Sequence, residues 1–178
     1  MGKPTLISTA TPSNAASVSI TSGIDSTYDE YMFVFMDINP ATDSQYLTFQ
    51  CNATDSTSYD ETITSTAFSA GNFESGGSPG LGYAAGEDQA QGTAYQKLVW
   101  ETGNGADESC AGVMHLFNPS STTYVKHFYS RVNNYGATDR TIDTFFAGYI
   151  NTTTAIDDIQ FKMTSGNFDG IIQMYGIA

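Results

Sequence analysis

The stretch Tyr31-Met32-Phe33-Val34-Phe35-Met36-Asp37-Ile38 is the part of the sequence that decides the fold. Aromatic and β-branched residues are enriched in strands, and they make up five of the eight residues of this run. An antiparallel strand with one wet face alternates apolar and polar residues, whereas a near-continuous apolar run is typical of a strand buried on both faces. We therefore predict a central strand over residues 31–38, covered on both sides.

The rest of the chain has a period close to two. In residues 45–50, for example, Leu47 and Phe49 alternate with polar neighbours, as expected for a half-buried strand. The predicted strands are residues 4–9, 15–20, 31–38, 45–50, 62–68, 95–100, 112–117, 124–132, 143–150, 156–163 and 171–177.

Turn signals separate these strands roughly every dozen residues, and no long amphipathic helix interrupts them. This pattern predicts an all-β fold, a single antiparallel β-sandwich domain over residues 1–178, jelly-roll-like, with about ten strands. The predicted core residues are Phe33, Phe35, Leu47, Phe49, Phe128, Phe146, Ile159, Phe161 and Ile172.

Three segments depart from the regular pattern. Residues 69–93 are rich in Gly, Ser and Ala and predict a long Gly-rich loop, with a short helix near residues 87–94 as the alternative. Residues 133–136 predict a turn. Residues 1–20 hold two short N-terminal strands, which we expect either to form an assembly arm that adds to a neighbour's sheet or to lie at the edge of their own sandwich.

Composition limits the classes of partner. Charged residues are 14% of the chain, against about 25% in an average domain. With 19 acidic and 6 basic residues the net charge is −13, which disfavours nucleic acid and anionic membrane surfaces. No apolar run approaches the roughly 20 residues that span a bilayer, and no leader sequence is recognisable, so we expect folding in the compartment of synthesis.

The sequence gives weak support for a metal site or a reactive thiol. The acidic turns at residues 25–30 and 55–61 lack the spacing of a calcium loop, so solvated turns are favoured. If Phe117 pairs with Thr123, His115 and His127 share one face, but a third zinc ligand is missing and a hydrogen-bonded or interfacial pair is favoured. Cys51 and Cys110 are interpreted as buried thiols, since their spacing cannot establish a disulfide. We predict no metal and no cofactor.

Catalysis is also disfavoured. Ser109 and Cys110 precede His115 without an orienting carboxylate at a telling spacing, and no nucleophile elbow or phosphate loop is present. We predict that the protein is not an enzyme and has no catalytic residues.

Carbohydrate or partner binding is the more serious alternative to a purely structural role. The candidate contact residues are Tyr83, Tyr95, Trp100 and Tyr135, because aromatic rings in or near loops can stack on sugars or on another protein. The alternative interpretation is that the tyrosines pack with their hydroxyls in water and that Trp100 belongs to the core.

Short sequence segments, spread over most of the chain, resemble those of a known protein family. They lie at residues 22–28 with 31–35, 38–43, 116–127, 148–149, 155–161, 165–167 and 174–177. In these segments the chain resembles small β-sandwich virion structural proteins of tailed bacteriophages, particularly marine ones, of the capsid decoration or tail-fibre-tip type. The resemblance implies a structural role and no active site.

The resemblance also implies a location and partners. We expect a capsid decoration (cement) protein on the outer surface of the head, made in the host bacterial cytoplasm, with its own copies in a homotrimer and the major capsid protein as partners. The alternative is a receptor- or glycan-binding tip of a tail fibre or spike, with tail proteins or a host-surface glycan as partners. The lack of a shaft segment in these 178 residues favours the first.

Overall fold

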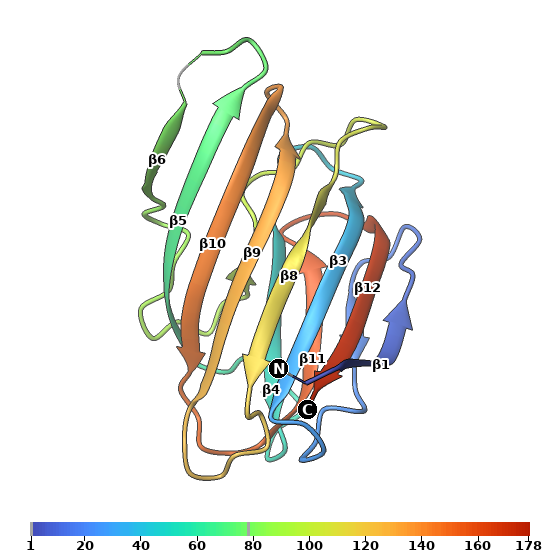
Figure 1. The fold of residues 1–178 in the computed structure, drawn as a ribbon, viewed down its shortest axis with the longest axis vertical. Helices are drawn as coiled ribbons and strands as arrows, with labels where there is room; N and C mark the ends of the chain where they lie inside the picture. The colour runs from blue at the N-terminus through green and yellow to red at the C-terminus, as the bar shows by residue number, and fades with distance from the viewer. Residues whose placement is uncertain (1, 78) are drawn as a thin grey trace.

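The computed structural model describes residues 2–77 and 79–178, which form an all-β sandwich of two antiparallel sheets (Figure 1). The strands are β1 (Pro4–Ala10), β2 (Val18–Ile20), β3 (Glu30–Pro40), β4 (Leu47–Ala53), β5 (Ile63–Phe73), β6 (Gly80–Tyr83), β7 (Gln96–Lys97), β8 (Cys110–Phe117), β9 (Lys126–Gly136), β10 (Arg140–Ile150), β11 (Ile156–Met163) and β12 (Phe168–Ile177). Within these described residues no helix is long and apolar enough to cross a membrane.

The two sheets have unequal size. The large sheet has the order β1-β12-β3-β8-β9-β10-β5-β6, and the small sheet has the order β2-β11-β4-β7. Eight of the strands have the order of a jelly roll. One of its sheets is the small sheet, and the other is formed by β3, β10, β5 and β6 of the large sheet, in that order. The β8–β9 hairpin is inserted between β3 and β10, and β12 with β1 extends the large sheet beyond β3. The predicted jelly-roll-like sandwich is therefore confirmed.

Alternation of side chains positions the core between the sheets. In β3, Tyr31, Phe33 and Phe35 point inward and are almost fully buried, while their neighbours are half-exposed. Phe161 of the small sheet lies against both phenylalanines, with ring centroids 5.4 and 5.3 Å away. All nine predicted core side chains are buried.

A bulge in β3 ends this regular alternation. The register with β12 shifts between Met36 and Asn39, where Asp37 has a φ of +52°. Opposite it, Gly170 has a φ of +139°, and a Cβ there would lie 2.9 Å from the Asp37 carbonyl oxygen. Glycine is required at this position because both the backbone angle and the close approach exclude a side chain.

The structure corrects two local predictions. Residues 69–93 are not one long loop, because β5 continues to Phe73 and β6 follows at Gly80–Tyr83. The reason is the partner strand, since β10 pairs with β5 over its full length, down to Arg140 opposite Phe73. Residues 133–136 belong to β9 and not to a turn, and the β9–β10 turn follows them, with Asp139 at a φ of +52°.

The N-terminal strands lie in their own sandwich. β1 pairs with β12 at one edge of the large sheet, and β2 pairs with β11 at one edge of the small sheet. This arrangement corresponds to the edge-strand alternative. The outer edge of β1 is free of a backbone partner within the described residues.

Candidate functional site

The segment between β6 and β8, residues 84–109, joins the two sheets and positions the candidate aromatic residues. Its backbone is bonded to β5 through Gly92 and Ile63, and Leu98 N–H donates to the Leu47 carbonyl of β4. At its centre the fully buried Gln96 amide accepts a 2.6 Å hydrogen bond from Ser65 Oγ and donates to the Lys97 carbonyl. Buried amides are stable only when they are bonded in this way, so the segment is a fixed scaffold.

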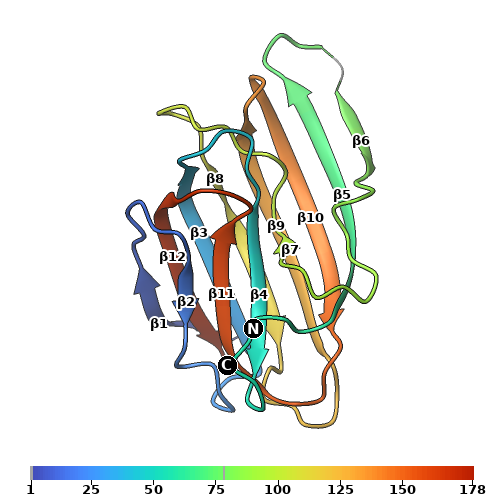
Figure 2. The same ribbon diagram turned by 180° about the vertical axis from the view of Figure 1, so that it is seen from behind.

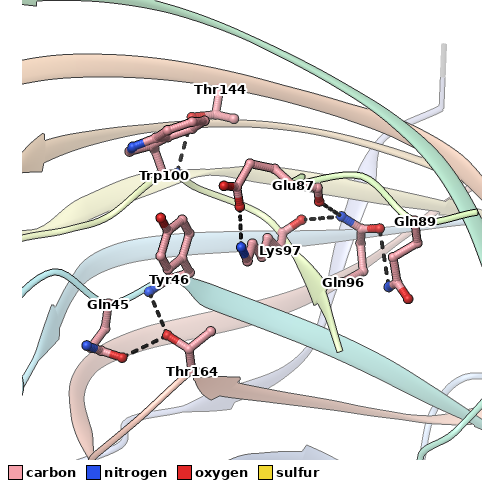
Figure 3. Close-up of polar contacts among 9 residues, drawn as sticks. All are labelled: Gln45, Tyr46, Glu87, Gln89, Gln96, Lys97, Trp100, Thr144 and Thr164. Atoms are coloured by element: carbon pink, nitrogen blue, oxygen red, sulfur yellow. Dashed lines mark hydrogen bonds and ion pairs between the residues drawn. The ribbon is translucent and has the colours of Figure 1, made fainter. Parts of the chain in front are cut away.

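A cation–aromatic stack extends from this scaffold (Figure 3). Lys97 forms an ion pair with Glu87, and its ammonium lies 4.2 Å from the ring centroid of Tyr46. The Tyr46 ring is in turn 6.4 Å from the ring of Trp100. The backbone N–H of Trp100 donates to Thr144 Oγ1 at 3.3 Å. These contacts hold Trp100 half-buried against the core.

Trp100 forms one wall of a cleft of about 300 Å³ on the inner side of the large sheet, which we call the inner cleft. The small sheet lies over only part of the large one, and β5 and β6 extend beyond it (Figure 2). The residues lining the inner cleft are Ser69, Gly71, Phe73, Gly80, Leu81, Gly82, Trp100, Arg140 and Ile142. Glycines of β5 and β6 keep this part of the sheet open.

Arg140 connects the inner cleft to a second hollow of about 500 Å³ at the end of the sheet. Its guanidinium pairs with Glu101 and lies 5.6 Å from the Phe73 ring, while Nε is buried without a partner among the described residues. Tyr135 lines the second hollow, where its hydroxyl donates to Asp139 Oδ1 at 3.4 Å, and the neighbouring Glu74 carboxylate raises the pKa of Tyr135 to about 12. Arg140 thus lines both hollows, one together with Trp100 and the other together with Tyr135.

The other two predicted contact residues lie elsewhere. Tyr83 pairs in register with Phe68, which faces away from the inner cleft, and its hydroxyl donates to Asp88. Tyr95 donates its hydroxyl to Gln160 of the small sheet, and the Lys162 ammonium lies 3.8 Å from its ring centroid. The four predicted contact residues therefore do not form one site: Trp100 lines the inner cleft, Tyr83 and Tyr135 lie on the opposite side of the large sheet, and Tyr95 contacts the small sheet.

A larger feature is the side of the large sheet that faces away from the small sheet, which we call the outer face. In Figure 1 this side faces the viewer, and no other described strand lies in front of it. Its side chains form rows of cross-strand partners. One row is Tyr83, Phe68, Phe145, Arg131, Val113, Val34 and Gln173. The next row is Thr66, Ala147, Tyr129, His115, Met32, Tyr175 and Leu6.

Aromatic pairs dominate the outer face. The rings of Phe68 and Phe145 stack at 4.6 Å with an interplanar angle of 7°, and the Arg131 guanidinium lies 5.0 Å from Phe145. His115 and Tyr129 stack at 4.6 Å. Phe68 is 46% exposed and Tyr129 44% exposed, although apolar residues on an outward sheet face are usually replaced by polar ones.

The prediction that His115 and His127 lie on one face of the sheet is confirmed, but the predicted register between their two strands is wrong. His115 pairs with Tyr129 and not with Val125, a shift of four residues that leaves His115 and His127 on the same face. His115 Nδ1 lies 2.6 Å from Glu30 Oε1, so this histidine is bonded to a carboxylate. The described residues contain no group of three or more side chains placed to hold a metal ion.

Both cysteines are buried free thiols in the described structure. Cys51 belongs to β4 and Cys110 to β8, so they lie in different sheets. Burial raises the pKa of the Cys110 thiol to about 12 and raises that of Cys51 as well. Protonated thiols of this kind are poor nucleophiles.

Sequence reasoning missed Phe73 and Arg140, which line the inner cleft, Glu101, which pairs with Arg140, and the stacked pair of Phe68 and Phe145. Two sequence signals point to the outer face: the apolar run at residues 31–38, and the alternation in residues 143–150, which places Phe145 on the side opposite the core residue Phe146. No family model, curated protein or solved structure matches this chain.

Proposed function

We propose that this protein is a non-enzymatic structural component of a bacteriophage virion, which acts by assembly on the particle surface. The observation that carries the proposal is the outer face, an aromatic sheet surface left open in the single chain. Large contiguous apolar patches on a folded domain mark interaction sites more often than not. The sequence segments that resemble virion proteins are the reason for proposing a virion as the assembly.

The distribution of charge supports an assembly role for this face. The two paired rows contain one charged side chain, Arg131, and the carboxylates of Glu30, Asp143 and Asp88 lie beside them. The chain as a whole has 19 acidic and 6 basic residues, so the remaining surface is strongly acidic. Depletion of charge together with enrichment of Tyr, Phe and Met is the composition of an interface core.

The preferred position is the capsid exterior, as a decoration protein that binds its own copies and the major capsid protein. An acidic exterior suits a protein that must stay soluble and must not bind DNA. Cryo-electron microscopy of the virions tests this directly. Density for this fold at symmetry-related positions over the capsid is the expected result, and absence of the chain from the particle would overturn the proposal.

A second candidate function is glycan binding by a tail-fibre or spike tip, and the inner cleft favours it. Trp100 and Phe73 offer apolar ring surface, and Arg140, which is held by Glu101, offers donors for sugar hydroxyls. Its volume of about 300 Å³ is at the lower end for small-ligand sites. Density confined to the tail would select this function over the first.

A glycan array tests the second candidate on the purified protein. Binding that is lost in Trp100→Ala and kept in Tyr124→Ala would support it, because Tyr124 is an exposed tyrosine that does not line the inner cleft. Retained binding in Trp100→Ala would remove the inner cleft as the glycan site.

A further inference from the structure

We propose that the outer face is covered by the outer face of a second copy of this chain, packed sheet on sheet about a twofold axis. This inference rests on the proposed assembly role of the face and names its partner. In such a pair both copies use the same patch, so one self-complementary surface is sufficient.

The apolar pattern of the central strand calls for a cover on both sides. In β3, Phe33 and Phe35 face the small sheet, while Met32, Val34 and Met36 lie on the outer face. Val34 continues across the sheet to Val113 of β8, and Met32 continues to His115. A near-continuous apolar strand is typical of a sheet buried on both faces, and the single chain covers only one.

The size of the outer face is sufficient for a stable pair. The eight strands hold 73 residues in all, and at ~3.4 Å per residue with about 4.8 Å between strands they give a face on the order of 1,200 Å². A standard stable interface buries roughly 800 Å² on each partner. Two twisted sheets pack face to face about 10 Å apart with their strands inclined by about 30°, so the contact area exceeds this requirement even with incomplete overlap.

The charge of the outer face allows a second copy to approach. Two chains with a net charge of −13 repel each other wherever their acidic surfaces meet. The outer face is the place where they can approach, because its carboxylates Glu30 and Asp143 both have side-chain partners within the chain. Asp143 is bonded to Arg131, with 2.7 Å between Oδ2 and Nη2, and Glu30 is bonded to His115.

The Arg131–Asp143 pair is also self-complementary. The two residues lie on β9 and β10, inside the sheet and away from both edge strands. A twofold axis close to the pair places Arg131 of each copy opposite Asp143 of the other. A threefold assembly would need two different complementary patches on each copy, and the outer face supplies one.

Sedimentation velocity and light scattering on the full purified chain test the proposal. The expected result is a mass of twice 19.1 kDa at micromolar concentrations, with association that tightens as salt is added, because salt screens the acidic surfaces. A mass of one copy at hundred-micromolar concentration, or of three copies, would overturn it.

A variant pair locates the interface. Phe145→Asp should weaken association at least tenfold, because it adds a buried like charge to each copy, whereas Ser19→Asp on the exposed strand β2 should leave it unchanged. Circular dichroism shows whether each variant is folded. If Phe145→Asp does not fold, Val113→Asp replaces it, and unchanged association in either folded variant would overturn the proposal.

The two proposals can fail separately. A chain that is monomeric in solution but present on virions contradicts the pairing and leaves the virion role in place. A dimer that is absent from virions contradicts the virion role and leaves the pairing in place.

Discussion

Phe145 and Phe146 are adjacent in β10 and lie on opposite sides of the large sheet. Phe146 is buried in the core, while Phe145 stacks on Phe68 on the outer face. One backbone segment thus presents the same side chain to two different environments. Phe146 contributes to the stability of the fold, whereas Phe145 contributes to the surface that we propose for assembly.

Alanine substitutions at the two positions should therefore behave differently. Phe146→Ala should cost ~3–5 kcal/mol of unfolding free energy, because it leaves a cavity between the sheets. Phe145→Ala should cost less than about 1.5 kcal/mol in the monomer, because the lost pair is half-exposed. Chemical denaturation below the association range measures both, and similar losses would contradict the assignment of the two faces.

Charge exchange should show whether two copies place Arg131 opposite Asp143. We expect Arg131→Asp alone and Asp143→Arg alone to weaken self-association about tenfold, because like charges then face each other. An equimolar mixture of the two variants should restore it, since each copy now carries the complement of the other. Sedimentation of the mixture is the measurement, and failure to recover would place the axis elsewhere.

Glycine 112 should be intolerant of a side chain. A Cβ there would lie 2.6 Å from Cα of Val132 and would also meet the Arg131 carbonyl on the neighbouring strand. Gly112→Ala should therefore cost about 1–3 kcal/mol through overpacking. Gly80→Ala is the matched control, because no described atom comes within 4 Å of its Cβ position, and its melting temperature should remain close to that of the parent chain.

Stability should increase as the pH falls from 7 toward 4.5. Burial raises the pKa of Glu61 above its ordinary value of 4.5, and the neighbouring Asp55 and Asp60 add to the effect. Burial raises the pKa of Asp157 in the same direction, helped by Asp158. The folded state then binds more protons than the unfolded state, so the unfolding free energy falls as the pH rises through this window.

Denaturation curves at several pH values check this dependence. Glu61→Gln should flatten it, since an amide cannot titrate. A slope that is equally steep in Glu61→Gln would assign the effect to other carboxylates.

The sequence predicts the layers of the fold better than its pairings. The position of β3 and the buried set that includes Phe33, Phe161 and Ile172 follow from alternation, because period two assigns a face to every residue in a strand. β6 was missed because Gly80 and Gly82 have low strand propensity, and the strand exists through its pairing with β5. Such pairing is a long-range property.

The candidate sites show the same limit. Trp100 and Tyr135 could be named as exposed aromatics, but their common neighbour Arg140 is assigned to them only by the fold. The stacking of Phe68 on Phe145 requires two strands, more than 70 positions apart in sequence, to be in the correct register. A change of one residue in that register would send one ring into the core.

The two free cysteines can be used to measure how often the sandwich opens. Cys51 is fixed in the small sheet and Cys110 in the large sheet, and both thiols are sealed between the layers. A thiol reagent can reach either one only after the layers separate. The rate of thiol labelling at each position therefore reports how often that sheet opens. A comparison of the rates in free chains and in assembled particles measures how much kinetic protection assembly adds. No additional cysteine has to be introduced for this measurement.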